Sequence, residues 1–200
     1  MADFRRYLPL SNRELQDESN VSSDWRPLTA QSLARFADLL QAMPESAWQA
    51  ESMRPLGRRE RMSVAAAVDR LARRVESSRF ELLFPSGAAE RAPDEMIAAL
   101  RRAAQSPLRR GVADLVALAL TCYDIAYPLG LPDPLDPKAS GAAVLARAAS
   151  ADSAIRSIVK QRTLAPTDAT WRIGTGPEIR ATAAVLLLWV AGRDVLPEFE

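Results

Sequence analysis

The stretch GVADLVALALTCYDIAYPLGL, residues 111–131, decides the fold of this chain. It follows an arginine-rich turn, contains about four helical turns of apolar residues, and stops at Pro128 and Gly130. As a helix it places six residues on neighbouring positions of one face: Ala113, Val116, Ala117, Leu120, Asp124 and Tyr127. We therefore expect a central helix whose apolar stripe ends at a carboxylate.

The composition fits one domain with a sizeable core, because 48% of the 200 residues are hydrophobic. A formal net charge of +1 predicts no nucleic-acid partner. The longest apolar run, residues 183–191, is shorter than the roughly 20 residues of a membrane-spanning helix, so we expect no membrane partner. The polar N-terminal residues do not resemble a signal peptide, and a cytoplasmic location is expected.

The most informative count is the absence of histidine. It excludes the Ser-His-Asp triad, His-bearing zinc sites and the two-His iron triad. One cysteine, Cys122, excludes an internal disulfide and a cysteine-cluster zinc site. Its apolar neighbours favour a packing role over a nucleophilic one. Any base would have to be Asp, Glu, Lys or Tyr.

Apolar periodicity predicts a mainly α-helical chain. Thr29 and Ser63 are expected to cap two of the helices, and Asp136 a third. Besides the central helix, we expect helices over residues 28–43, 64–75 with an extension through 79–84, 93–104, 137–149, 152–161 and 179–191.

The period changes at Arg162, where two short strands are expected. Residues 163–165 and 170–173 form a hairpin by composition around Pro166-Thr167-Asp168. Gly176-Pro177-Glu178 is expected to open the last helix. The preceding GTG lacks the spacing and the lysine of a phosphate-binding loop. Trp171 is expected to seal the hairpin to the bundle, and Asp168 to cap a turn.

Four strings in this sequence are similar to the actinobacterial mycothiol-dependent maleylpyruvate isomerase family, whose core is the DinB/YfiT-like helical bundle. They are SVAAAVDRL (63–71, after a loop containing Trp48), CYDIAYPLGL (122–131), TLAPTDATWRIGTGPEIR (163–180) and AAVLLLWVAGR (183–193), in the order of the family. The resemblance implies an up-down helical bundle with a small C-terminal β-hairpin plus helix. We expect an N-terminal extension over residues 1–24, the bundle over 25–131, and C-terminal helices with the hairpin over 132–200.

The resemblance also implies a divalent metal, usually zinc, held by two histidines and an acid, and a thiol cofactor, mycothiol. Carried over residue by residue, the histidine positions fall on Arg70 and Thr121, and the acid position on Ala117. Arginine is a permanent cation without an acceptor, alanine offers no ligand, and a lone threonine hydroxyl is a poor one. We therefore expect neither metal nor cofactor at this place.

Arg70 is the sharpest polar feature that remains. A buried guanidinium needs a partner, and Asp124 is the natural candidate. Three interpretations stay open: an ion pair of Arg70 with Asp124, a solvent-exposed Arg70, and an anion-binding pocket. The expected ligand-binding set is Arg70, Thr121, Asp124 and Tyr127, with no residue assigned to catalysis.

The sequence thus predicts a degenerate, metal-free family member, a pseudoenzyme that binds a small anionic molecule or a protein partner. Two alternatives are a metal-independent, thiol-dependent isomerase or transferase that holds an anionic substrate through Arg70, and a regulatory or scaffold subunit. The oligomeric state is open, with a homodimer among the possibilities.

Overall fold

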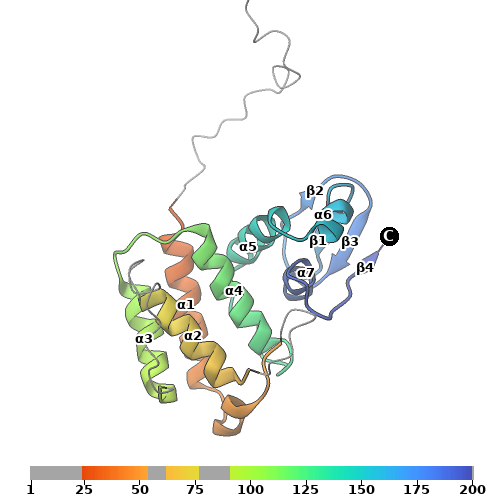
Figure 1. Ribbon diagram of the computed structural model, residues 1–200. Helices are drawn as coiled ribbons and strands as arrows, with labels where there is room; N and C mark the ends of the chain where they lie inside the picture. Colours follow the sequence, from red (N-terminus) through yellow and green to blue (C-terminus); the bar gives the residue numbers. More distant parts are fainter. Residues whose placement is uncertain (1–23, 54–61, 77–90, 200) are drawn as a thin grey trace, which may run out of the picture.

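A computed structural model describes residues 24–53, 62–76 and 91–199, and this part of the chain is mainly α-helical (Figure 1). The helices are α1 (Arg26–Gln41), the 3-10 helix η3 (Glu45–Gln49), α2 (Val64–Glu76), α3 (Pro93–Gln105), α4 (Val112–Ala126), α5 (Pro137–Ala149), α6 (Ser153–Val159) and α7 (Ala183–Val190). The strands are β1 (Thr163–Pro166), β2 (Ile173–Gly174), β3 (Glu178–Ala181) and β4 (Glu198–Phe199). The predicted mainly α class is confirmed.

The first four α-helices form a bundle, with α5, α6, α7 and the sheet beside α4 (Figure 1). Within the bundle, α1 packs on α3, and α2 contacts both α3 and α4. One continuous core runs from Leu33 in α1 to Val190 in α7. Burying one large aliphatic side chain stabilises the fold by about 1.5–3 kcal/mol, so this shared core holds the two halves together.

Local capping explains where several helices begin. The Ser63 hydroxyl accepts a hydrogen bond from the Ala66 N–H (3.1 Å), and the Asp136 carboxylate accepts one from the Lys138 N–H (2.9 Å), as predicted. The predicted Thr29 cap is wrong. α1 already begins at Arg26 with a proline in its first turn, and the Thr29 hydroxyl donates back to the Trp25 carbonyl (2.7 Å).

The C-terminal sheet has the strand order β2-β1-β3-β4. β1 pairs antiparallel with β2, matching the predicted hairpin, but it also pairs in parallel with β3. The prediction of a helix that opens at Gly176-Pro177-Glu178 is therefore wrong over the first turn of that helix. Residues 178–181 are a strand, and α7 begins at Ala183, where the Thr182 hydroxyl accepts a hydrogen bond from the Val185 N–H (3.3 Å).

Two glycines let the chain return beside β1. Gly174 and Gly176 have φ values of 100° and 117°, a region that residues with a side chain rarely adopt. A Cβ atom would lie 2.2 Å from the Arg162 carbonyl oxygen at Gly174, and 2.3 Å from that of Gln161 at Gly176. The GTG segment is therefore a close backbone crossing, which accounts for its glycines without a phosphate.

The buried face of α4 is not the predicted stripe. Its buried apolar residues are Leu115, Leu118, Ala119, Cys122, Tyr123, Ile125 and Ala126, whereas Ala113 is exposed, and Val116, Ala117 and Leu120 are half-buried. Of the predicted stripe, only Asp124 is buried. α4 is apolar on most sides, so periodicity alone does not choose between its faces.

Parts of the prediction fall outside the described residues. They are the N-terminal extension up to residue 23 and the run 79–84. Among the helices that the structure describes, none combines the length and apolarity needed to cross a membrane.

Candidate functional site

α2 and α4 lie side by side and run in opposite directions (Figure 1). At one end, the Arg74 guanidinium donates to the Ala113 carbonyl (3.3 Å), and Arg110 donates to the Val75 carbonyl (2.6 Å). At the other end, the chain before α2 meets the end of α4, where the Met53 N–H donates to the carbonyl of Asp124 (2.8 Å).

The antiparallel register shows how the three positions that the family resemblance assigns to metal ligands lie relative to one another. Position 70 lies one turn before Arg74, and position 117 lies one turn after Ala113. Position 70 therefore lies near the height of position 117, and position 121 lies one turn, about 6 Å, further along α4. We call the surface around Arg70, Ala117 and Thr121 the α2–α4 face.

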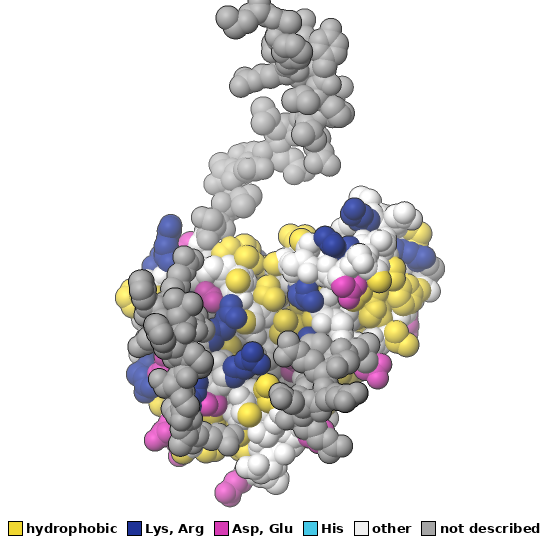
Figure 2. All heavy atoms as spheres, in the orientation of Figure 1, with side chains coloured by type: hydrophobic (Ala, Val, Ile, Leu, Met, Phe, Trp, Pro, Cys, Tyr) yellow, Lys and Arg dark blue, Asp and Glu magenta, His cyan; other side chains and the backbone are white. Residues whose placement is uncertain are grey.

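The side chains on the α2–α4 face do not form a ligand cage. Arg70 is exposed, which agrees with one of the three interpretations left open by the sequence. Thr121 is half-buried, and its hydroxyl donates its proton to the Ala117 carbonyl (2.9 Å), so that the oxygen can only accept a further hydrogen bond. Figure 2 shows Lys and Arg side chains over this part of the bundle.

Asp124 is paired with Arg193, so the predicted ion pair with Arg70 is wrong. Arg193 Nε and Nη2 lie 2.8 Å and 2.5 Å from the two carboxylate oxygens, a bidentate geometry. The Asp124 and Arg193 side chains are only 12% and 10% exposed. Burial raises the pKa of Asp124, and the hydrogen bonds and charge of Arg193 oppose that rise.

Arg193 is a site residue that was not predicted from the sequence. It directly follows the apolar string of α7 and Gly192, whose φ of 75° ends the helix in the left-handed region. The sequence did contain a signal, because an arginine directly follows a strongly apolar helix in a chain whose Asp124 needs a cationic partner. It could not be read without knowing that α7 ends beside α4.

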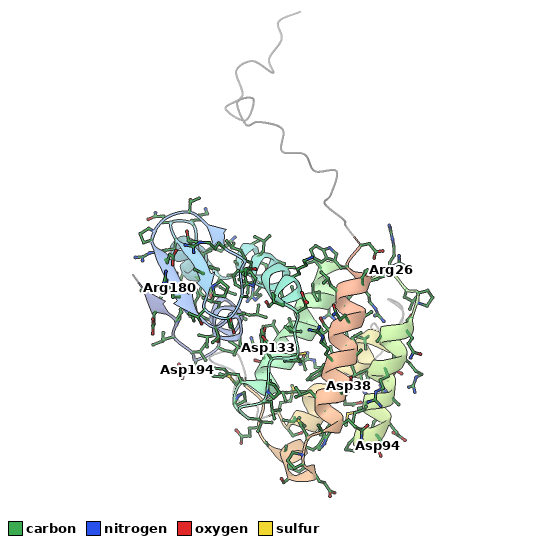
Figure 3. The ribbon with its side chains drawn as sticks, turned by 180° about the vertical axis from the view of Figure 1, so that it is seen from behind. Arg26, Asp38, Asp94, Asp133, Arg180 and Asp194 are labelled. Atoms are coloured by element: carbon green, nitrogen blue, oxygen red, sulfur yellow. The ribbon has the colours of Figure 1, made fainter. Side chains whose placement is uncertain are left out.

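A second polar contact joins α4 to the loop that follows it. The Tyr123 side chain is 1% exposed, and its hydroxyl donates to Asp133 (2.9 Å), which also accepts from the Leu135 N–H (2.8 Å). Figure 3 shows Asp133 where the loop after α4 passes between the two halves. Burial raises the pKa of Asp133, and also raises that of Tyr123 together with the neighbouring Asp133 charge.

The two remaining candidates, Tyr127 and Cys122, lie in opposite surroundings. Tyr127 lies at the end of α4 with 44% of its surface exposed. Cys122 is fully buried, and burial raises its pKa, so the thiol stays protonated near neutral pH.

Hydrogen bonds join three of the four strings quoted for the resemblance. The second and fourth strings are linked by Asp124 and Arg193. The Asp168 carboxylate accepts a hydrogen bond from the Ala183 N–H (2.8 Å), linking the third and fourth strings. The Trp171 indole N–H donates to the Ser140 hydroxyl (3.2 Å), and its ring packs on Gly141 of α5. Trp171 thus joins the segment between β1 and β2 to α5 rather than to the bundle, and Asp168 caps the start of α7 rather than its own turn.

A divalent metal does not fit the residues at positions 70, 117 and 121. A guanidinium, a methyl group and a hydroxyl that already shares its proton supply at most one weak oxygen ligand. Within residues 24–53, 62–76 and 91–199, no three His, Cys, Asp or Glu side chains come together as a metal would require.

An open depression of about 420 Å³ lies on α3, lined by Arg91, Asp94, Glu95, Ala98 and Arg102. Its two arginines are already engaged, because Arg91 and Arg102 both bind the carboxylate of Glu76 (2.5 and 2.7 Å). Asp69 adds a further partner for Arg91 at 3.1 Å. This network ties α2 to α3 and leaves the depression with no free cation of its own among the described residues.

Comparison with known proteins does not assign this chain to a family. No protein-family model, no curated protein and no solved structure matches the chain.

Proposed function

We propose that this chain is a metal-free member of the mycothiol-dependent maleylpyruvate isomerase family that binds a small anionic molecule on the α2–α4 face. One observation carries the proposal. At the height of the bundle where the resemblance would place a metal, the chain presents the exposed cation of Arg70, and neither Ala117 nor Thr121 offers it a carboxylate.

The family part of the proposal rests on how the resembling strings fit together. Three of the four strings are joined by hydrogen bonds, Asp124 of the second to Arg193 of the fourth, and Asp168 of the third to Ala183 of the fourth. The strings also stand along the chain in the order of the family. These contacts and this order support a shared architecture and leave the chemistry to the residues present.

The binding part rests on charge. The Asp124 carboxylate is neutralised by Arg193, so it does not oppose an anion near Arg70. Arg74 lies on the same side of α2 and forms an ion pair with Asp114 (3.5 Å). Arginine suits carboxylate or phosphate because its planar fork donates two parallel hydrogen bonds. We propose a cytoplasmic location, consistent with a protonated and buried Cys122.

The first experiment is elemental analysis of untagged protein, since a His-tag would add the ligands that this sequence lacks. We expect substoichiometric zinc after dialysis. Zinc near one equivalent per chain would overturn the metal-free assignment and favour an enzyme.

The second experiment measures thermal stability against increasing concentrations of maleate and of inorganic phosphate. We expect a saturable rise in melting temperature for the native chain, reduced by more than half in Arg70→Gln. Arg156→Gln is the matched control, because Arg156 is an exposed arginine on α6, away from this face. Equal shifts in the native chain and in Arg70→Gln would remove Arg70 from the site.

A further inference from the structure

Two exposed arginines, Arg70 and Arg74, lie one turn apart on the same side of α2. Residues four apart on a helix are neighbours, separated by about 6 Å along its axis. The Arg74 guanidinium reaches the first turn of α4, where it donates to the Ala113 carbonyl (3.3 Å). Arg70 forms no hydrogen bond or ion pair with any residue that the structure describes. Two neighbouring cations therefore stand at the α2–α4 face.

The side of α2 that packs on α3 shows a different balance of charge. There the Arg73 guanidinium donates to the Asp69 carboxylate (2.8 Å). The Glu76 carboxylate accepts hydrogen bonds from Arg91 (2.5 Å) and from Arg102 (2.7 Å). Each of these three arginines is thus held by a direct hydrogen bond to a carboxylate of α2, which is not the case for Arg70.

Asp114, in the first turn of α4, is the carboxylate that faces Arg74. Its Oδ1 lies 3.5 Å from Arg74 Nε, whereas a charge-assisted hydrogen bond of this kind measures about 2.7–2.9 Å. Its Oδ2 accepts a hydrogen bond from the Gly111 N–H (3.2 Å), so the same carboxylate also caps α4. Arg110, bound to the Val75 carbonyl (2.6 Å), adds a further positive charge at this end of the helix pair. Asp114 therefore only partly neutralises Arg74.

This arrangement of charge fits a dianionic group better than a single carboxylate. A carboxylate uses both of its oxygens on the fork of one arginine. A phosphoryl group has three terminal oxygens and close to two negative charges, so it can accept hydrogen bonds from two guanidiniums at once. It would also relieve the repulsion between two like charges four residues apart. The Thr121 hydroxyl already donates its proton to the Ala117 carbonyl, so the arginines are the donors for such a group.

We propose that Arg70 and Arg74 together bind a dianionic phosphoryl group, and that Asp114 selects against monoanions by competing for Arg74. The inference rests on the proposed anion site, for which it names the ligand class and the second cation. A monoanion that approaches Arg74 meets the repulsion of Asp114, whereas a dianion gains about twice the attraction of the two arginines. Arg74 then exchanges its long contact with Asp114 for hydrogen bonds to the ligand.

Ligand titrations of the untagged full chain test the ligand class. The backbone amide NMR signals of Ala117 and Thr121 report the dissociation constants of methyl phosphate, acetate and succinate at about pH 8, well above the second phosphate pKa of about 6. We expect methyl phosphate to bind at least tenfold more tightly than acetate, which carries the same methyl group and one charge. It should bind at least threefold more tightly than succinate, whose two charges lie on separate carboxylates. Equal affinity for methyl phosphate and either carboxylate would overturn the proposal.

Inorganic phosphate, titrated in the same way, distinguishes the two sources of a phosphoryl group. Within the proposal, tighter binding of methyl phosphate assigns the site to a phosphate monoester, and tighter binding of inorganic phosphate assigns it to free phosphate. Binding of inorganic phosphate no tighter than that of acetate would overturn recognition of the phosphoryl group itself.

Two variants test the roles of Arg74 and Asp114, with circular dichroism to verify the fold. Arg74→Gln should weaken methyl phosphate at least fivefold and change the affinity for acetate less than twofold. Asp114→Asn keeps an oxygen that can accept from the Gly111 N–H but removes the competing charge, so it should strengthen methyl phosphate at least threefold. Arg156→Gln, at an exposed arginine of α6, is the matched control and should leave every affinity unchanged. An unchanged affinity for methyl phosphate in Arg74→Gln or in Asp114→Asn would overturn the role of that residue.

Arg70→Gln separates this inference from the proposed function. Weaker binding of methyl phosphate in both Arg70→Gln and Arg74→Gln supports a site built from two arginines. Weaker binding of all anions in Arg70→Gln, with native binding of methyl phosphate in Arg74→Gln, would overturn the inference and leave the proposed single-arginine site standing. Native binding of all anions in Arg70→Gln would overturn the inference and the proposed function together.

Discussion

The Arg193 guanidinium donates hydrogen bonds to both carboxylate oxygens of Asp124, at 2.8 Å and 2.5 Å, and thereby joins the end of α7 to the end of α4. The same guanidinium donates to the Ala191 carbonyl (3.0 Å), which fixes its direction. The backbone carbonyl of Asp124 accepts a hydrogen bond from the Met53 N–H (2.8 Å), from the loop before α2. Three parts of the chain far apart in sequence are thus held at one residue.

Removing one partner of this pair leaves a nearly buried charge without compensation. We expect Arg193→Gln to lower the free energy of unfolding by about 3–5 kcal/mol, measured by urea denaturation. The exposed pair of Arg101 and Asp38 is the matched control, and Arg101→Gln should cost about 1 kcal/mol or less. Similar losses in the two variants would contradict a special role for the buried pair.

The carboxyl of Asp133 should make stability depend on pH. Because burial raises its pKa above the ordinary value of about 3.9, the folded protein holds this proton more tightly than the unfolded chain. Its stabilising contribution is therefore complete below about pH 3.9 and is lost as the pH rises through the folded-state pKa. Asp133→Asn has no carboxyl that titrates at this position, so it lacks this dependence of stability on pH.

The free energy of unfolding of the native chain minus that of Asp133→Asn should consequently fall as the pH rises from about 4 to about 7. Urea denaturation at several pH values measures it. Asp94→Asn, at an exposed acid in the first turn of α3, provides the comparison. A difference that stays constant or rises with pH would refute the assignment.

The sequence allowed the helices to be predicted where local signals agree with packing. α2 and α3 have apolar residues on one face only, and α5 has Asp136 as its cap, so their positions follow from period and capping. β3 was missed because its pairing with β1 is parallel and non-local, and residues 178–181 are followed directly by an apolar run that extends the helical pattern.

The candidate site was harder to predict for the same physical reason. α4 is apolar nearly all round, so the sequence could not say which side faces the core, and the expected stripe was placed on the wrong side. The partner of Asp124 is 69 residues away, and only the tertiary fold selects Arg193 over Arg70. The need of Asp124 for a cation was predictable, whereas the identity of that cation was not.

Gly174 should not tolerate a side chain. Its φ of 100° is unfavourable for alanine, and the new Cβ would overlap the Arg162 carbonyl oxygen. We expect Gly174→Ala to lower the free energy of unfolding by about 1–3 kcal/mol or more, read as a lower melting temperature. Thr175→Ala changes the exposed neighbour and should have little effect. An unaltered melting temperature in Gly174→Ala would mean that the crossing of β1 and the GTG segment is looser than described.

The positions that the family resemblance assigns to the metal can be tested by restoring its ligands. In Arg70→His/Ala117→Glu/Thr121→His, two imidazoles and a carboxylate lie within about one helical turn of each other along the antiparallel pair α2 and α4, an arrangement suited to zinc. We expect the untagged variant to retain about one zinc per chain after dialysis, and to gain about 2.7 kcal/mol of stability at a free zinc concentration 100 times its dissociation constant.

The matched control places the same three residue types on a single helix, as Ala98→Glu/Arg101→His/Gln105→His on α3. One helix face supplies two imidazoles to a metal but does not enclose it, so this variant should bind zinc more weakly and lose it on dialysis. If the two variants hold zinc equally well, positions 70, 117 and 121 do not converge. The residue correspondence with the isomerase family would then fail, although Asp124 and Arg193 would still join the two halves of the fold.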